Sequence, residues 1–452
     1  MVFTTDQQTL DDLNIFGKQG GDSIAQIFDR TNTRGGAVLL EEMFRYPLSS
    51  HDAINKRSGI IHGFAAAGTE FPFQPALFDA IESYLSITDE RTKLATDERT
   101  ALNRLSQLIA VDVDTAVIYK GVGALVELVK ALAAFNAALA SAGPARPNAM
   151  PHYSDERSAI QTLLDEPDLA SIIAHPDKGK LSHNTTAAYD VLLRFRHRES
   201  IQRLLQSIYR LDVYCSIARV ARERKFVFPT ALPQDRHIVS IEGLYHPQVN
   251  NAVPNNIAIS PGNNVLFLTG ANMAGKSTFM KSLSIALFLA HMGFPVPATQ
   301  MEFSVLDGMY TTINLPDNLG MGASHFYAEV LRVKKVAGQL QQGKSLFVVF
   351  DELFRGTNVK DAYEATVAFT KAFARQRNSL FIISTHIIEA GDVIKESCDN
   401  VGFFYLPTLM EGNKPVYTYR LEKGITADRH GMVIINNEGI LDILNNGQQD
   451  PR

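Results

Sequence analysis

The stretch that decides the fold reads Leu268-Thr269-Gly270-Ala271-Asn272-Met273-Ala274-Gly275-Lys276-Ser277-Thr278. It fits Gly-x-x-x-x-Gly-Lys-Ser/Thr, the pattern of a phosphate-binding loop, or P-loop. The apolar run 264–269 before it predicts a buried strand, and 279–294 after it predicts a helix. In that arrangement the loop N–H groups and the positive end of the helix face the phosphates. The alternative is a chance glycine-rich turn before a helix, but the Lys-Ser pair and both flanks favour a nucleotide site.

Individual positions in this loop have predicted roles. Lys276 can reach the β- and γ-phosphates of a nucleotide, and the Ser277 hydroxyl can ligate Mg²⁺. The predicted ligands are therefore ATP and Mg²⁺. The other predicted ATP-binding residues of the loop are Gly270, Asn272, Met273, Gly275 and Thr278.

The composition is that of an ordinary globular protein. The 452 residues suffice for two or three domains, and 45% of them are apolar. A net charge of −5 does not suggest a protein that coats nucleic acid by bulk charge, although a local basic patch is compatible with it. Cys215 and Cys398 are the two cysteines, so we predict neither a disulfide framework nor a cysteine zinc site. The N-terminus carries no signal-peptide pattern and the apolar run 283–294 is too short to span a bilayer, so we expect a soluble cytoplasmic protein.

The two halves of the chain have different periodicities. Apolar residues recur at helical spacing over 125–139, and 187–224 gives another long helical pattern. Beyond 228–230, β-type runs alternate with helical ones, as in an α/β domain with a largely parallel sheet. We therefore predict a mixed fold, an all-α N-terminal domain followed by an α/β domain, with the boundary near 235. The predicted strands are 265–269, 346–350, 380–384 and 401–406, and the predicted helices among them are 279–294, 328–340 and 362–375.

The helical pattern over 187–224 is rich in arginine. Arginines so placed could contact the phosphate backbone of a nucleic acid. A run of this kind is more often a solvated helix face, and the sequence leaves both interpretations open. The residues are Arg194, Arg196, Arg198, Arg203, Arg210, Arg219, Arg222 and Arg224.

Two further predicted strands end in polar residues. The run 346–350 leads into Asp351-Glu352, a Walker B pattern in which Asp351 can hold the Mg²⁺ shell and Glu352 can polarise an attacking water. The alternative is an exposed acidic turn, but two acids after five apolar residues are costly without a cation. The run 380–384 leads into Thr385-His386, and we interpret His386 as a group that senses the γ-phosphate or steadies that water. Glu352 and His386 are thus the predicted catalytic residues, and Ser277 and Asp351 the predicted metal ligands.

A second loop with glycines and a serine precedes the helix that starts at Tyr327. It reads Asn318-Leu319-Gly320-Met321-Gly322-Ala323-Ser324-His325-Phe326. One site does not need two phosphate-binding loops from one subunit, so this loop could complete the nucleotide site of a partner subunit. Ser324 could equally be an ordinary helix cap.

These four elements, in this order, resemble the ATPase domain of the MutS family of DNA mismatch-repair proteins, within the wider class of ABC-type ATPases. The resemblance covers about 235–440 and extends more weakly into the first half. It implies an N-terminal tail at 1–30, a helical core and lever domain at 31–235 and an ATPase domain at 236–452. The stretches that carry it are Tyr245-His246-Pro247, Val253-Pro254-Asn255-Asn256, 269–278, Val296-Pro297-Ala298, 317–319, 324–326, Glu329, Asp351-Glu352, 355–358 and Thr385-His386, with 31–36, 46–48, 54–57 and 211–218 upstream.

The resemblance implies a Mg²⁺-dependent ATPase that forms a homodimer through its ATPase domain. ATP turnover would be coupled to DNA binding in mismatch repair or related DNA metabolism, with no membrane partner. Ser324 and Asn358 would act in trans on the ATP of the partner. Tyr419 would stack on the adenine, whereas Val253 stands where an opposing aromatic ring is usual, a departure from the usual adenine sandwich.

The chain also departs from the family pattern elsewhere. Only about 30 residues precede the core, so we expect the mismatch-reading domain and the connector to be absent, and 30–230 leaves no clear room for a full DNA clamp. Ala271, Ala274 and Phe354 stand where Pro, Gly and Gly are usual. These departures keep a second hypothesis open, a nucleotide-gated scaffold whose partner is a protein rather than DNA.

Overall fold

The chain folds into two compact units. One comprises Met1–Ile27, Met43–Ser58 and Arg224–Arg452, and the other comprises Phe28–Glu42 and Gly59–Glu223. The predicted mixed fold is confirmed, because the N-terminal half is helical and the C-terminal half is rich in sheet. The contiguous domain limits implied by the resemblance stay a prediction. The computed structural model describes residues 3–17, 21–94, 113–141, 151–176, 179–313, 325–354, 356–412, 414–426 and 443.

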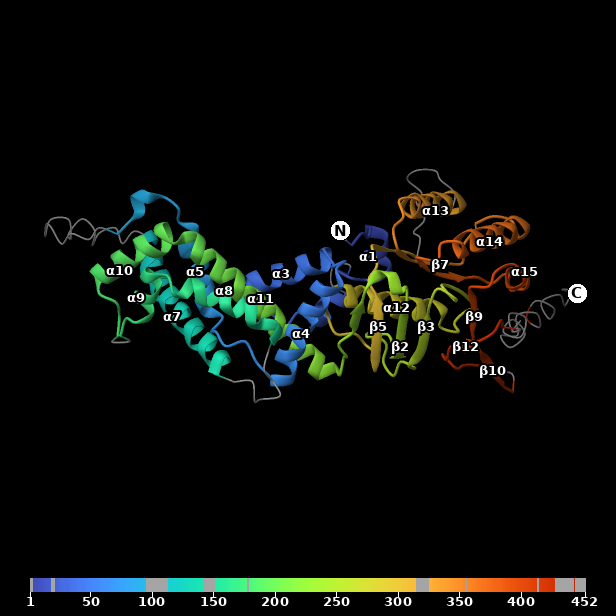
Figure 1. Ribbon diagram of the computed structural model, residues 1–452, viewed down its shortest axis with the longest axis horizontal. Coiled ribbons are helices and arrows are strands. Elements are labelled where there is room, and N and C mark those ends of the chain that lie inside the picture. The colour runs from blue at the N-terminus through green and yellow to red at the C-terminus, as the bar shows by residue number, and fades with distance from the viewer. Residues whose placement is uncertain are drawn as a thin grey trace, which may run out of the picture. The chain divides into compact units, whose positions relative to one another are not determined.

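A six-stranded sheet forms the centre of the strand-rich unit (Figure 1). Its order is β12-β9-β4-β8-β7-β6, and every neighbouring pair from β9 to β6 is parallel, while β12 is antiparallel. The apolar runs suit strands that are covered on both faces. The strands are β4 Val265–Gly270, β6 Gly308–Thr312, β7 Leu346–Asp351, β8 Leu380–Ser384, β9 Val401–Leu406 and β12 Glu422–Lys423.

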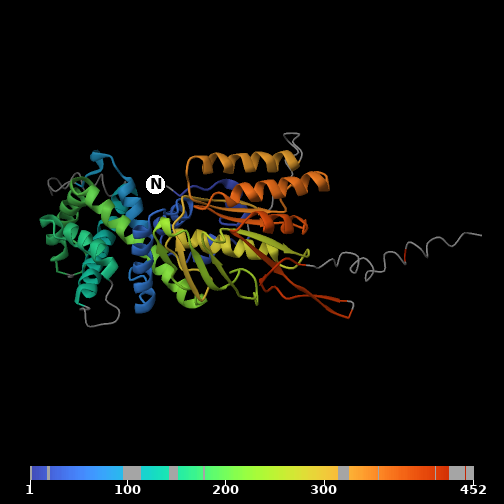
Figure 2. The ribbon, with the colours of Figure 1, turned by 45° about the vertical axis from the view of Figure 1, so that its right-hand side comes forward.

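Helices cover both faces of this sheet. Helix α12 (Lys276–His291) lies between it and a second, four-stranded sheet, and contacts β4 and β2 (Figure 2). Nearly all its residues are buried, as expected for a helix that is apolar all round. Helices α13 (His325–Gln341), α14 (Val359–Ala374) and α15 (Ala390–Ser397) pack on the other face. The second sheet has the order β1-β5-β2-β3, with β1 Thr230–Leu232, β2 Val239–Leu244, β3 Asn255–Ile259 and β5 Gln300–Ser304, and a separate hairpin consists of β10 Thr408–Glu411 and β11 Lys414–Tyr417.

Helix α7 is the central helix of the other unit. It contacts α5, α8, α9 and α10. By length and composition its span Asp114–Ala140 could also cross a membrane, a property that core helices share. Among the described residues of the N-terminal half, the α-helices are α1 Gln7–Asp12, α2 Ile24–Phe28, α3 Arg34–Arg45, α4 His51–Ala67, α5 Ala76–Ser86, α7 Val113–Ser141, α8 Ser154–Leu164, α9 Pro167–Ile173, α10 His183–Asp190 and α11 Arg198–Arg224.

The segment 187–224 is helical nearly throughout, as its pattern predicts, but a π-helical segment at Val191–Arg196 separates α10 from α11. This π-helical segment directs Arg194 into the core, where its guanidinium forms a fully buried ion pair with Asp190 at 2.7 Å. Tyr84 donates a hydrogen bond to the same carboxylate at 2.9 Å. Arg194 therefore belongs to the core and is not part of a surface that could contact nucleic acid.

An aspartate caps the start of α3 within this unit. The carboxylate of Asp212 in α11 accepts hydrogen bonds from the backbone N–H groups of Asn32 and Thr33 and from the Thr33 hydroxyl. A Cβ at Gly36 would clash with that carboxylate, so the glycine permits the close approach. The segments 31–36 and 211–218, which are far apart in the sequence, are joined by these contacts.

The N-terminal segment covers the outer edge of the six-stranded sheet at β6. Thr4 forms a parallel bridge with Gly308, in which Thr4 N–H donates to Asp307 O at 2.8 Å and Met309 N–H donates to Thr4 O at 2.9 Å. Further along, Asp12 accepts from the Thr311 hydroxyl at 2.7 Å and from Ile313 N–H at 2.9 Å. Covering an edge strand in this way removes a template for pairing with another chain.

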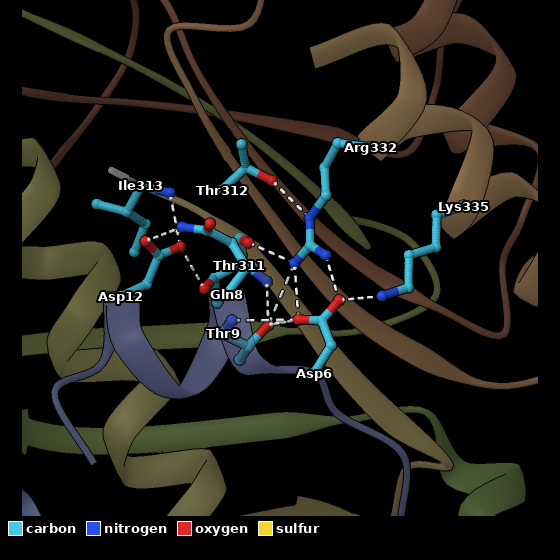
Figure 3. A network of polar contacts seen from close by, with 9 residues as sticks. All are labelled: Asp6, Gln8, Thr9, Asp12, Thr311, Thr312, Ile313, Arg332 and Lys335. Carbon is cyan, nitrogen blue, oxygen red and sulfur yellow. Dashed lines mark hydrogen bonds and ion pairs between the residues drawn. The ribbon is translucent and has the colours of Figure 1, made fainter. Parts of the chain in front are cut away.

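A partly buried charge cluster holds α1 in this position (Figure 3). Asp6 caps α1 by accepting from Thr9 N–H, and its carboxylate is paired with Arg332 and Lys335 of α13. Arg332 also donates to Thr311 O at 2.7 Å. Burial alone would raise the pKa of Asp6, but the hydrogen bonds from Arg332 and Lys335 hold this pKa well below its usual range. The cluster therefore ties α1 to both β6 and α13.

We predict that Asp6→Asn lowers the free energy of unfolding by about 3 kcal/mol, because it leaves a buried guanidinium without its counter-charge. Denaturant unfolding at neutral pH measures this loss. Asp11→Asn, a change at an exposed residue of the same helix, should cost no more than about 0.5 kcal/mol.

The effect of Asp6→Asn should also depend on pH. Because the folded-state pKa of Asp6 is depressed, its contribution is complete above the unfolded-state value of about 3.9 and is lost as the pH falls below it. The stability difference between the native chain and Asp6→Asn should therefore be constant from about pH 7 to about pH 5 and shrink as the pH falls from about 5 to about 2. A difference that stays constant over this lower range would contradict the assigned ion pair.

Candidate functional site

The carboxyl ends of β4, β8 and β7 meet at one edge of the parallel sheet. Ser384, the last residue of β8, pairs with Leu268 of β4 on one side and with Asp351 of β7 on the other. The segments that follow these three strands therefore emerge side by side. This is the edge at which open α/β sheets commonly bind ligands.

The loop after β4 turns into α12 at Gly275. Gly270 and Gly275 have φ values of +143° and +101°, which L side chains rarely adopt. Gly275 offers no side chain to cap α12, so the first N–H groups of the helix suit an anion. The buried Lys276 ammonium donates to Gly270 O at 2.9 Å and to Ala271 O at 3.2 Å. Burial lowers the pKa of Lys276, while Asp351 and Glu352 act in the opposite direction.

Asp351 lies beside this loop, and one of its two carboxylate oxygens accepts a hydrogen bond while the other has none from the described residues. Ser277 donates its hydroxyl hydrogen to Asp351 Oδ2 at 2.7 Å. Asp351 Oδ1 is buried and has no hydrogen-bond partner among the described residues. Burial raises the pKa of this carboxyl, and Glu352 adds to the rise. Because hydroxyl and carboxylate oxygens are ligands that Mg²⁺ prefers, Ser277 and Asp351 fit a magnesium site.

Glu352 and His386 form a contact between the ends of β7 and β8. His386 Nε2 lies 2.6 Å from Glu352 Oε1. The Glu352 backbone has φ +52°, and its N–H donates to Ser384 O at 2.9 Å. A left-handed conformation at a residue other than glycine costs about 1 kcal/mol and is often found at functional sites.

Phe354, two residues further on, also has a positive φ, of +66°. This conformation explains why glycine is usual at the position. The ring is only 1% exposed, and its centroid lies 5.1 Å from that of Phe369 in α14 and 5.9 Å from that of Phe326 in α13. Burial of the ring thus offsets the cost of the backbone conformation.

A cavity of about 570 Å³ opens in front of the loop. Of the predicted ATP-binding residues, all but Gly270 line it, and Glu352 lines it as well. Burial and the nearby Lys281 lower the pKa of His246 to about 4, so its imidazole is neutral at neutral pH. The lining residues that were not predicted include Ala271 in the loop itself and, from other segments, Tyr245, His246, Val249, Asn255 and Leu406. Of these, Ala271, Tyr245, His246 and Asn255 lie in stretches that carried the resemblance.

The two residues predicted to act in trans have different outcomes. Ser324 lies outside the described residues. Asn358 is exposed and caps α14, where its Oδ1 accepts from Asp361 N–H at 2.9 Å. A contact of either residue with a partner's nucleotide stays a prediction.

Comparison with known protein families matches both halves of the chain. The model described as MutS domain III matches residues 8–218, and the model described as MutS domain V matches residues 266–449. The chain belongs to the MutS family.

Curated relatives agree with this assignment. DNA mismatch repair protein MutS of Bacillus cereus (strain B4264) is 31% identical over 255 residues, which are 54% of this chain and 28% of the relative. The protein of the same name from Fusobacterium nucleatum is 29% identical over 250 residues, 54% of this chain and 27% of the relative. That from Halalkalibacterium halodurans is 28% identical over 267 residues, 57% and 30% respectively. The chain therefore spans less than a third of the length of these relatives.

We predict that Phe354→Gly destabilises this MutS-family chain by about 2 kcal/mol, because removing a buried ring costs more than the relieved backbone strain returns. Phe354→Leu keeps the left-handed residue and most of the apolar volume, and should cost about 1 kcal/mol. Denaturant unfolding of both variants measures the difference. A Phe354→Gly protein that is more stable than the native chain would show that strain dominates.

Proposed function

We propose that this chain is a Mg²⁺-dependent ATPase of the P-loop class that works as a dimer and couples ATP turnover to DNA binding in mismatch repair or related DNA metabolism. The observation that carries the proposal is the group at the sheet edge. A lysine and a helix start suited to an anion lie beside a serine–aspartate pair suited to a cation.

Each side chain has a role in this proposal. The N–H groups around Gly275 and the ammonium of Lys276 bind the phosphates, after Lys276 exchanges its contacts with Gly270 O and Ala271 O for phosphate oxygens. Ser277 and Asp351 would hold Mg²⁺, which when bound neutralises phosphate charge. Tyr419 offers an aromatic face to the base.

Glu352 is the proposed general base. Its carboxylate accepts the proton of the water that attacks the terminal phosphate, and His386 orients the carboxylate through the 2.6 Å contact. This contact also gives His386 a position from which it can respond to the terminal phosphate.

Exposed apolar side chains near the loop support the proposed dimer. Met273 is 77% exposed and Val359, at the start of α14, is 78% exposed. Tyr327 and Leu331 of α13 are exposed as well. Large apolar side chains left exposed to water suit burial against a second subunit.

We predict that Glu352→Gln retains ATP but slows its hydrolysis by about a hundredfold or more, as expected when a general base is removed. Lys276→Ala is the matched variant, and it should weaken ATP binding itself. Equilibrium binding and phosphate release measured on both separate the two roles. Unchanged turnover in Glu352→Gln would remove Glu352 from the mechanism, and light scattering of this variant with ATP tests the dimer.

Support for DNA binding is narrower than the arginine-rich pattern suggested. Besides the buried Arg194, Arg196 pairs with Asp168 and Arg219 with Glu223. Arg198, Arg203 and Arg210 of α11 line one open cavity of about 910 Å³. We take this cavity as the candidate phosphate-contacting surface.

We predict that the double variant Arg203→Ala/Arg210→Ala weakens duplex DNA binding at low salt and reduces the salt slope by about 2, since each arginine would neutralise one phosphate. Arg219→Ala, on the same helix, is the control and should change neither. A native chain that binds no DNA at low salt but captures a protein partner in the presence of ATP would favour the scaffold hypothesis.

A further inference from the structure

One amide side chain connects two segments that line the cavity and are far apart in the sequence. Asn255 is the first residue of β3. Its Nδ2 donates to Val253 O at 3.3 Å in its own segment and to Tyr419 O at 3.0 Å in the other. Its Oδ1 accepts from Leu421 N–H at 2.7 Å. Residues more than 160 positions apart in the sequence are thus held by one side chain.

Tyr419 is in a conformation that needs such support. Its φ is +55°, and its side chain is 45% exposed. The two bonds from Asn255 hold the backbone on both sides of Arg420, at Tyr419 O and at Leu421 N–H. The ring rests against the phosphate-binding loop, so that a Cβ at Gly275 would lie 3.0 Å from Tyr419 Cδ1.

We propose that Asn255 is a positioning residue for the nucleobase, because its hydrogen bonds hold Tyr419 where the ring can stack on the base. The inference rests on the proposed nucleotide-binding function. It adds that preference for a base-bearing nucleotide over bare polyphosphate depends on Asn255, while phosphate affinity does not.

The hydrogen bonds of Asn255 do not involve the groups proposed to bind the phosphates, although the Tyr419 ring lies against Gly275, and this makes the inference testable. The phosphate end consists of the backbone of 270–278 and the Lys276 ammonium. The hydrogen bonds that Asn255 makes go to residues 253, 419 and 421. An Asn255 variant should therefore discriminate between ligands with and without a base.

The first experiment measures equilibrium binding of MgATP and of magnesium tripolyphosphate by calorimetry. Asn255→Ala should lower the affinity for MgATP about tenfold or more, since stacking one base on an aromatic ring contributes about that much. The affinity for tripolyphosphate should stay within about twofold of the native value. Asn255→Asp keeps the acceptor for Leu421 N–H but replaces the donor to Tyr419 O, and should lose MgATP affinity in the same selective way. Asn256→Ala is the control, since it loses one bond of the same kind, from Gly243 N–H, outside these contacts.

The double variant Asn255→Ala/Tyr419→Ala distinguishes positioning from general destabilisation. If Asn255 acts through Tyr419, Tyr419→Ala alone should produce the same loss and the double variant little more. Additive losses, or equal losses for both ligands, would overturn the inference while leaving the proposed ATPase standing. A native chain that binds neither ligand would overturn both.

A second readout uses the absence of tryptophan from the sequence. Tyr419→Trp introduces the one tryptophan of the chain, which can be excited selectively over the tyrosines; MgATP should change its emission, whereas tripolyphosphate should not. Adding Asn255→Ala should abolish the response at an ATP concentration that saturates the single variant. A response of unchanged amplitude and midpoint would overturn the inference.

Discussion

Parallel pairing of β8 with both β4 and β7 is the constraint on which the candidate site depends. The pairing sets Leu268, Ser384 and Asp351 at one level, so the segments after three strands must emerge together. The loop, the two acids and the histidine are thereby assembled from distant parts of the sequence. The covered edge at β6 and the buried α12 keep this sheet in a fixed register.

The charges at this edge are arranged for ligands rather than for stability. Lys276 is buried and bonds to two carbonyls of its own loop, and Asp351 keeps a buried oxygen with no hydrogen-bond partner in the described part of the chain. A folded core without function would replace such groups by apolar ones, since unpaired buried polar atoms cost about 1–3 kcal/mol each. Left-handed backbone at Met273, Glu352 and Tyr419 adds further cost around the same cavity. An anion at Lys276 and a cation at Asp351, bound together, would offset the electrostatic cost of burying these two groups.

Local sequence patterns predict those features of the fold and site that depend on neighbouring residues in the chain. Four strands of the six-stranded sheet, β4, β7, β8 and β9, follow from apolar runs, and the glycine loop after β4 and the acids after β7 follow from the residues at the ends of those two runs. Three features could not be predicted in this way. They are the ion pair of Asp6 with Arg332, the burial of Arg194 and the hydrogen bonds of Asn255 to residues 419 and 421. Each of these features is a side-chain contact that depends on tertiary packing. The sequence of an arginine-rich helix does not show which arginines face solvent and which face the core. The sequence shows Phe354 as a departure from the usual glycine. Only the tertiary structure shows that packing against Phe369 and Phe326 offsets the cost of its backbone conformation.

The two ends of the cavity differ in which amino-acid substitutions they can accommodate. The phosphate end is made of backbone N–H groups, which any residue of compatible φ supplies, so Ala271 and Ala274 can stand in place of the usual residues while Gly275 with φ +101° cannot readily be replaced. The proposed base end depends on side chains, and Val253 stands where the resemblance implies an aromatic residue. If Tyr419 is the ring that contacts a base there, its orientation carries more of that contact than it would in a sandwich. A hydrogen bond from the Asn255 side chain at the start of β3 to Tyr419 O is then an economical way to keep an exposed ring in place.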